Sequence, residues 1–282
     1  ILIMVTAPLT YQRVIITGAS SGIGEQFAHT LAPLVKEIIL TARRTDRLEA
    51  LATDLQRQYP HVRIHVFSCN LMDMDALDGL IHQLSCLSPA STLLINNAGL
   101  GDYGEFSTAP WERIHAMLMV NMNALTKLCH HLLPSLLTNG GDIINISSLA
   151  SSLPIPDFAV YAASKSYVLS LSEAIRMEVK AQGINVLAVC PGPVSTEFGQ
   201  VARRPGFTGN MMPGKDSFCT TKEQVVAESL QAMLRRKARV YPGRRIKPIA
   251  LLLSLLPMGI IRMIMGRRPR RCLTSNHQTS ND

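Results

Sequence analysis

Short apolar runs rich in β-branched residues alternate along the chain with longer stretches of helical spacing. Six runs predict buried strands, at residues 14–17, 38–41, 62–66, 93–95, 143–146 and 185–189. Residues 46–59 are typical of the stretches between them, because Leu48, Leu51 and Leu55 share one helical face behind a capping box of Asp46 and Glu49. The alternation predicts an α/β fold, a parallel sheet with helices on both faces, which binds ligands beyond the carboxyl ends of its strands.

One domain accounts for most of the chain. No long linker, low-complexity tract or internal repeat interrupts residues 13–245, a length that can bury a sizeable core. We expect a leader at residues 1–12 and an extension at residues 246–282 that ends in a disordered tail from residue 273. Residues 194–221 are rich in Gly, Pro, Phe and Met without a clear period, which predicts a mobile flap over a pocket.

The net charge of +8 is concentrated near the C-terminus. Residues 235–271 hold twelve Lys and Arg and no Asp or Glu, which leaves the remainder of the chain at 8 − 12 = −4. This segment contains a long aliphatic run and one aromatic residue, Tyr241, whereas segments that bind nucleic acid interleave aromatic residues with their charges. We therefore expect no nucleic-acid partner.

The cysteine pattern and the start of the chain bear on the compartment. Six cysteines are scattered without a CxxC pair. The apolar residues 1–5 are too few for a signal peptide and for a membrane span, which needs roughly 20 residues. We expect reduced thiols, no metal site and a cytoplasmic protein.

A glycine-rich turn, Thr-Gly-Ala-Ser-Ser-Gly-Ile-Gly, follows the first predicted strand at residues 17–24. Its glycines allow a tight turn and a close approach of the backbone to a pyrophosphate at the N-terminus of the next helix. Residues 96–99, Asn-Asn-Ala-Gly, end the fourth strand, where the backbone would pass close to the adenosine half of a dinucleotide. Taken singly, each segment is also consistent with an ordinary turn.

A pair of arginines follows the second predicted strand. At this position a carboxylate favours NAD through the ribose 2′-hydroxyl, and cations favour NADP through its 2′-phosphate. Because no acid precedes Asp46, we expect Arg43, assisted by Ser20, Ser21 and Arg44, to bind a 2′-phosphate. The alternative is a solvated arginine pair at the start of a surface helix.

Tyr161 and Lys165 stand at i and i+4 of the helix predicted for residues 159–182, so both side chains can reach one ligand. A tyrosine with the ordinary pKa of about 10 exchanges protons slowly at pH 7, and a nearby ammonium lowers that pKa by stabilising the phenolate. Ser148, with Ser147 as the competing candidate, closes the fifth strand, where its hydroxyl can donate to an oxygen that becomes negative. This set predicts proton transfer to a carbonyl oxygen.

With these motifs in this order, residues 13–241 resemble the short-chain dehydrogenase/reductase family. The likeness includes the glycine-rich turn, residues 96–99, Asn121, the Tyr-Ala-Ala-Ser-Lys motif and Cys-Pro-Gly-Pro-Val-Ser-Thr at residues 190–196. The resemblance implies a Rossmann-like doubly wound parallel sheet of about seven strands, in a dinucleotide-binding catalytic domain. It also implies a homodimer or homotetramer.

The resemblance implies roles for individual residues. It makes Tyr161 the proton donor or acceptor, Ser148 a ligand of the substrate oxygen, Lys165 a further contact of the nicotinamide ribose, and Asn121 the support of a proton relay. The residues that it and the motifs assign to cofactor binding are Gly18, Ser20, Ser21, Gly22, Ile23, Gly24, Arg43, Arg44, Asn70, Leu71, Asn97, Ala98, Gly99, Tyr161, Lys165, Pro191, Gly192, Val194 and Thr196.

Two positions depart from the family pattern. Asn70 and Thr92 stand where many members have Asp, so the mode of adenine recognition differs in detail. The segment Thr-Ala-Arg-Arg at residues 41–44 is similar to that of NADP-preferring members, and we expect NADP(H) to be preferred over NAD(H).

The extension combines an apolar run at residues 249–261, interrupted by Pro257, with flanking Arg and Lys. The run is too short to span a bilayer. Peripheral contact of residues 246–271 with an anionic membrane and packing on the domain or on a sister subunit both fit this pattern. The tail is also loosely similar to that of family members that act on lipids, such as long-chain 3-oxoacyl-thioester reductases.

We therefore predict an NADP(H)-dependent oxidoreductase that interconverts a ketone or aldehyde and an alcohol on a lipophilic substrate. The alternative is a non-catalytic NADP-binding sensor or a membrane-docked scaffold, which would not need an activated tyrosine. The flap contains five large apolar residues that could form an apolar pocket wall and so favour a lipophilic substrate: Phe198, Phe207, Met211, Met212 and Phe218. The alternative is that these side chains only anchor the flap to the core.

Overall fold

The computed structural model describes residues 10–204 and 219–266, and its centre is a sheet of seven parallel strands. Most of the predicted leader and half of the predicted flap, with Phe207, Met211, Met212 and Phe218, lie outside the described residues, as does the predicted disordered tail. The strand order is β3-β2-β1-β4-β5-β6-β7. The strands are β1 (Arg13–Thr17), β2 (Glu37–Ala42), β3 (Arg63–Ser68), β4 (Thr92–Asn96), β5 (Gly141–Ile146), β6 (Val186–Val189) and β7 (Arg239–Val240).

The predicted α/β fold with its doubly wound parallel sheet is confirmed. The six apolar runs form β1 to β6, with bounds that differ by one or two residues from those expected. The sequence pattern missed β7, because this strand has only two residues, too few to show a period. It extends the sheet at its edge by pairing with β6.

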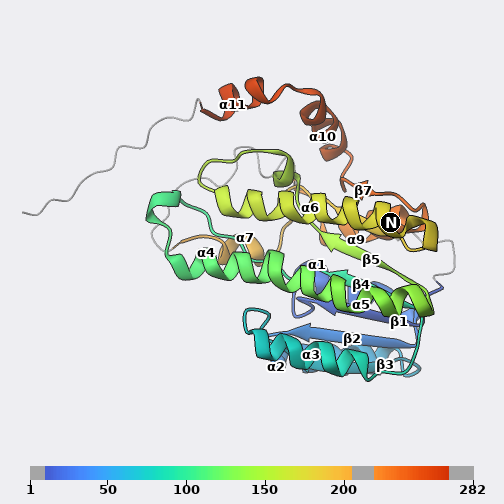
Figure 1. Ribbon diagram of the computed structural model, residues 1–282. Coiled ribbons are helices and arrows are strands. Elements are labelled where there is room, and N and C mark those ends of the chain that lie inside the picture. Colours follow the sequence, from blue (N-terminus) through green and yellow to red (C-terminus); the bar gives the residue numbers. More distant parts are fainter. Residues whose placement is uncertain (1–9, 205–218, 267–282) are drawn as a thin grey trace, which may run out of the picture.

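Helices cover both faces of the sheet (Figure 1). One face packs against α1 (Gly22–Leu31), α2 (Thr45–Gln58) and α9 (Lys222–Leu234). The opposite face packs against α3 (Met74–Ser85), α5 (Leu125–Asn139) and α6 (Ala159–Val179). Because side chains alternate along a strand, Val14 and Ile16 of β1 enter the first core and Ile15 enters the second.

The remaining helices are short or lie outside these two layers. α4 (Trp111–Leu118) continues through the π-helical segment η3 (Met119–Ala124) into α5. α10 (Ile246–Leu255) and α11 (Met258–Gly266) follow β7 and lie outside the helix layers in Figure 1. The others are α7 (Phe198–Val201) and the 3-10 turns η1 (Ala32–Leu34), η2 (Phe106–Thr108), η4 (Leu149–Ser152) and η5 (Lys180–Gln182).

The start of α2 differs from the sequence prediction. The helix begins at Thr45, with Arg44 as its N-cap and without a side-chain cap hydrogen bond. Asp46 therefore lies inside the first turn and forms no capping box with Glu49. Its charge is still favourable there, because the N-terminus of a helix carries partial positive charge.

Pro257 separates α10 from α11, as expected of a residue that interrupts a helix. Within residues 10–204 and 219–266, no single helix has both the length and the apolar composition to cross a membrane. Residues of α10 and α11 meet the length and composition for a membrane span only when the two helices are taken together, and the two helices are bent by 114° relative to each other.

The strand order creates a crevice at one edge of the sheet. From β1 the chain proceeds to β2 and β3 on one side, and β4 to β7 lie on the other side. The loops after β1 and β4 therefore leave in opposite directions and open a space between them, beyond Thr17 and Asn96.

A buried ion pair closes the opposite end of β1 and β2. Arg13 binds Glu37, and both side chains are 7% exposed. His65 lies 3.0 Å from the same carboxylate. Burial opposes ionisation of Glu37, but the hydrogen bonds and charges of Arg13 and His65 outweigh it and hold the pKa of Glu37 below its ordinary value. The Glu37 carboxyl is therefore ionised in the folded protein at neutral pH.

We expect Arg13→Met to lower the free energy of unfolding by about 3 kcal/mol, because it leaves the Glu37 carboxylate buried without its main partner. Arg13→Met/Glu37→Met should recover most of that loss, since no charge is then buried. Urea unfolding followed by circular dichroism measures both values.

The exposed pair Arg57 and Asp54 provides the control, and Arg57→Met should cost less than about 1 kcal/mol. A double variant no more stable than Arg13→Met alone would contradict this account of the pair.

Candidate active site

The glycine-rich turn at the end of β1 requires glycine at several of its positions. Gly18 and Gly22 have φ angles of 66° and 61°, in the left-handed region that favours glycine. A Cβ atom on Gly18 would lie 2.8 Å from Cα of Ala98, and one on Gly24 would collide with the carbonyl oxygen of Gly18. The turn therefore brings the backbone after β1 against the backbone after β4.

Hydrogen bonds tie the two loops together. The backbone N–H groups of Asn97 and Ala98 both donate to Oγ1 of Thr17, at 3.0 Å. Nδ2 of Asn97 donates to the carbonyl oxygens of Thr17 and Gly18, at 3.0 and 3.1 Å. The amide of Asn97 thus holds the turn in place, and Gly24 packs behind the turn.

At the end of β2 the structure shows Arg44 as the arginine that faces the turn. Its guanidinium donates to Oγ of Ser20, at 3.1 and 3.2 Å, and to Oγ of Ser21, at 2.8 Å. Arg43 lines the same cleft, is exposed, and has no hydrogen-bond partner among the described residues. The serine contacts therefore belong to Arg44, and which of the two arginines binds a 2′-phosphate stays a prediction.

Sequence reasoning missed Glu197, which binds this arginine. Its carboxylate lies 2.8 Å from Nη1 of Arg44 and 2.5 Å from Nη1 of Arg47. Hydrogen bonds from Arg47 and Arg44 lower the pKa of Glu197 to about 2. No motif marks this residue, because its partners lie about 150 positions earlier in the chain.

Tyr161 and Lys165 lie on one side of α6, as their spacing predicts, and Ser148 faces them from the end of β5. Nζ of Lys165 donates to the carbonyl oxygen of Ile146, at 2.8 Å, and lies 5.7 Å from the centroid of the Tyr161 ring. Ser147, the competing serine, is buried and donates to the carbonyl oxygen of Lys165, at 2.8 Å. Ser148 is therefore the serine available to a ligand.

The pKa of Tyr161 differs from the expectation that Lys165 lowers it. Burial raises the pKa of Tyr161 to about 12, and its hydrogen bond with Ser148 offsets only part of that rise. Burial also lowers the pKa of Lys165 to about 8. At pH 7 the tyrosine therefore holds its proton and the lysine carries a positive charge.

Asn121 lies in the π-helical segment and is 1% exposed. Its Oδ1 accepts from the backbone N–H of Leu100, at 2.8 Å, and its Nδ2 donates to the carbonyl oxygen of Leu100 and to Oγ of Ser164, both at 2.9 Å. The residue fixes the loop after β4 against α6. It does not line the cleft itself, so the proton relay stays a prediction.

The loop after β6 forms another wall of the cleft. Pro191, Gly192, Val194 and Thr196 all line it, as expected. The side chain of Thr196 packs on Gly22: a Cβ atom added to Gly22 would lie 3.2 Å from Cγ2 of Thr196.

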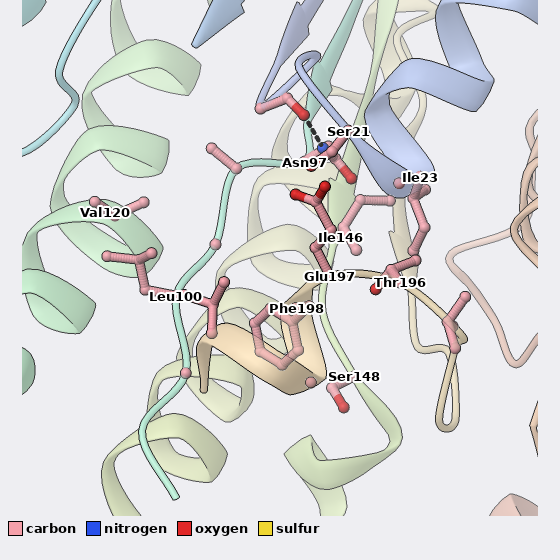
Figure 2. A pocket seen from close by; sticks show the side chains of 18 of the residues that line it. Ser21, Ile23, Asn97, Leu100, Val120, Ile146, Ser148, Thr196, Glu197 and Phe198 are labelled. Atoms are coloured by element: carbon pink, nitrogen blue, oxygen red, sulfur yellow. Dashed lines mark hydrogen bonds between the residues drawn. The ribbon is translucent and has the colours of Figure 1, made fainter. Parts of the chain in front are cut away.

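Aromatic rings, including those of Phe158, Tyr161 and Phe198, gather at the Tyr161 end of the cleft. Phe158 stacks on Tyr161 with ring centroids 4.1 Å apart, and Phe198 of α7 lies 5.4 Å from Tyr161. Figure 2 shows the labelled side chains along one cleft, from Ser21 and Asn97 at one end to Ser148 at the other, with Phe198 between them. Of these rings, the sequence prediction included Tyr161 and Phe198 but missed Phe158.

A second set of contacts holds α7 over the cleft. The backbone N–H of Tyr103 donates to the carbonyl oxygen of Ala202, at 2.8 Å. Asp102, which is 4% exposed, binds Arg204 at 2.6 Å and Arg113 at 2.7 Å. Since these residues are far apart in sequence and belong to no motif, only the structure identifies them.

Of the predicted site residues, the structure brings all but three to the lining of this cleft. The exceptions are Gly24 and Asn121, which support the lining from behind, and Asn70. The Asn70 side chain is exposed and its Oδ1 accepts from the backbone N–H of Met72, at 3.3 Å. The adjacent Leu71 does line the cleft.

The chain is similar to known oxidoreductases. The sequence model of the family described as short chain dehydrogenase matches residues 12–205. A sulfoacetaldehyde reductase from Chromohalobacter salexigens is 35% identical over 191 residues, 66% of this chain and 73% of that protein. A very-long-chain 3-oxoacyl-CoA reductase-like protein from Arabidopsis thaliana is 34% identical over 191 residues, 65% of this chain and 60% of that protein.

Among solved structures, a short-chain dehydrogenase from Sphingobium yanoikuyae in complex with NADPH has a TM-score of 0.75 and 28% identity, over 92% of this chain and 96% of that one. The pyrophosphate of such a dinucleotide fits against the glycine-rich turn, where glycines leave room for a close approach, and at the start of α1. The cleft is therefore a site for a nicotinamide cofactor.

Gly24→Ala should weaken the binding of NADPH at least tenfold, because the added Cβ atom displaces Gly18 and the amide of Asn97. Titration of the protein with NADPH, followed by nicotinamide fluorescence, measures the change.

Gly79→Ala is the matched control, since a Cβ atom there meets no atom within 4 Å and the residue lies within α3. NADPH affinity equal in Gly24→Ala and the control would contradict the close contact assigned to the turn.

Proposed function

Because this chain belongs to the short-chain dehydrogenase/reductase family and is therefore an NAD(P)-dependent oxidoreductase, we propose that it interconverts a lipophilic ketone or aldehyde and its alcohol, with NADP(H) preferred. The observation that carries the proposal is the position of Tyr161. Its ring contacts those of Phe158 and Phe198, within the cleft that the glycine-rich turn lines. The hydroxyl meets Ser148 there.

The chain's own residues supply the proton chemistry. When bound, the nicotinamide supplies a hydride to a carbonyl carbon or accepts one from the alcohol. Ser148 orients the carbonyl oxygen, and Tyr161 donates its proton to that oxygen as negative charge develops. The ammonium of Lys165 stabilises the Tyr161 phenolate left behind. In the oxidation direction Tyr161 accepts the proton.

Ser20, Ser21 and Arg44 are the groups that favour NADP(H) over NAD(H). Two hydroxyls and a guanidinium point to one place beside the turn, a set suited to a phosphate. In this structure the Glu197 carboxylate binds both Arg44 and Arg47. The carboxylate would therefore keep a cationic partner when Arg44 binds a 2′-phosphate.

The lining of the substrate end supports a lipophilic substrate. Leu100, Val120, Phe158, Phe198 and Val201 line the cleft. The cations that line it within the described residues are Arg43, Arg44 and Lys165, and the two arginines lie at the opposite end, beside the turn. The relatives include one reductase named for sulfoacetaldehyde, a small polar substrate, and one named for very-long-chain acyl substrates. The apolar wall is the argument for the long-chain, lipophilic class.

NADPH absorbance with the purified protein tests this substrate class on a panel of long-chain aldehydes, 3-oxoacyl thioesters, steroid ketones and sulfoacetaldehyde. We expect turnover with lipophilic members, because their apolar surface is buried in the cleft. Turnover confined to sulfoacetaldehyde and other small polar carbonyls would contradict the proposal.

Arg44→Ala should weaken NADPH at least tenfold and NADH much less, because it removes charge-assisted hydrogen bonds that each contribute about 1.5–3 kcal/mol. Arg43→Ala serves as the comparison and should have the smaller effect, since Arg43 lacks the two serine contacts. Calorimetric titration with both cofactors measures the preference. An equal loss of NADPH and NADH affinity in Arg44→Ala would rule out the phosphate role.

Carbonyl reduction should slow as pH rises through about 8. Lys165 is charged below its lowered pKa of about 8 and neutral above it, whereas Tyr161, with a pKa of about 12, stays protonated across this range. The pH profile of kcat/KM for reduction measures the effect.

Lys165→Arg keeps its charge and should lose this decline above pH 8, although its activity will be lower overall. Lys180→Arg, on an exposed lysine that directly follows α6, should retain it. A profile that is flat to pH 10 in the wild type would contradict the role given to Lys165.

A further inference from the structure

The outer sides of α10 and α11 carry the largest group of exposed apolar side chains in the described part of the chain. Thirteen large apolar side chains are exposed within residues 10–204 and 219–266, and seven of them fall in residues 251–264. The exposed fractions reach 58% for Leu252, 73% for Leu255, 53% for Met263 and 55% for Ile264. Such a concentration on a folded domain marks a contact surface.

The same helices are fixed to the domain by their inner side. Ile246, Ala250 and Ile261 are buried, at 1%, 5% and 4% exposure. Ile246 fills the space beside Gly192, where an added Cβ atom would lie 2.5 Å from its Cδ1. A helix held along one side and apolar along the other can lie flat on an interface.

The charge around this surface is positive. Residues 244–266, which include both helices, hold four Lys and Arg and no Asp or Glu. Among them Arg244 and Arg262 are exposed, and Lys247 is bound at 2.9 Å by Glu228 of α9. Cations beside exposed aliphatic side chains match the phosphates and acyl chains of an anionic bilayer.

A second copy of this chain matches the surface less well. Symmetric pairing would bring the same patch of both subunits together, with the exposed Arg244 and Arg262 on each side and no carboxylate within residues 244–266. Charge complementarity therefore favours lipid over self-association.

We propose that the outer surface of α10 and α11 binds the surface of anionic membranes. The helices begin beside Gly192, which lines the cofactor cleft, so docking holds the cleft close to the lipid. A lipophilic substrate dissolved in the bilayer would then have a short path to Tyr161. This last consequence, but not the docking itself, rests on the proposed function.

Cosedimentation of the full chain with vesicles tests the docking. We expect binding to vesicles of phosphatidylcholine with 30% phosphatidylserine, at least tenfold weaker binding to pure phosphatidylcholine, and weakening by 0.5 M salt. Leu255→Glu/Ile264→Glu should bind the anionic vesicles at least tenfold more weakly, because both exposed side chains are removed from the lipid-facing surface.

Met177→Glu is the matched control, since Met177 is 74% exposed and belongs to α6 and not to α10 or α11. It should bind vesicles as the wild type does. Thermal unfolding of all three proteins separates loss of binding from loss of fold, and NADPH affinity, which does not need the membrane, separates it from failure of the active site.

Two results would overturn the proposal. One is equal vesicle binding by Leu255→Glu/Ile264→Glu and the wild type. The other is a wild-type dimer, seen by light scattering, that binds no anionic vesicles and becomes monomeric in the double variant, because that outcome assigns the surface to a second copy.

Discussion

The hydrogen bond from Lys165 to the carbonyl oxygen of Ile146 is the contact on which the active site depends most. It joins α6 to the end of β5, and Ser147 adds a second bond in the reverse direction, to the carbonyl oxygen of Lys165. Because Tyr161 lies one helical turn before Lys165, this join sets its hydroxyl beside Ser148. The price of this arrangement is a buried lysine, whose pKa falls to about 8.

The cofactor half of the cleft rests on an equivalent tie between β1 and β4. Thr17 and Asn97 form hydrogen bonds with each other's backbone and side-chain groups. Glycine at position 18 allows the two loops to contact each other. Parallel strands end with unpaired backbone groups, so side chains must complete their hydrogen bonds at this edge of the sheet. The groups that do so here are also those that shape the cleft.

Local patterns were sufficient to predict the sheet, its helices and most of the cleft lining. The strand runs and the spacing of Tyr161 and Lys165 are short-range signals, and both were confirmed in position. Contacts between distant segments could not be predicted in this way, as with Glu197 on Arg44. The contacts of Arg44 with Ser20 and Ser21 could not be predicted for the same reason. The tyrosine pKa was misjudged because burial cannot be read from spacing.

The central claim is that Tyr161 transfers the proton, and Tyr161→Phe tests it most directly. With the best carbonyl substrate and saturating NADPH, the account predicts a turnover about 10²–10⁴-fold below wild type. NADPH affinity should stay within about twofold, because the aromatic ring remains. Tyr167→Phe, on the same helix with its hydroxyl 2.9 Å from Thr126, should turn over normally. Wild-type turnover by Tyr161→Phe would contradict the account.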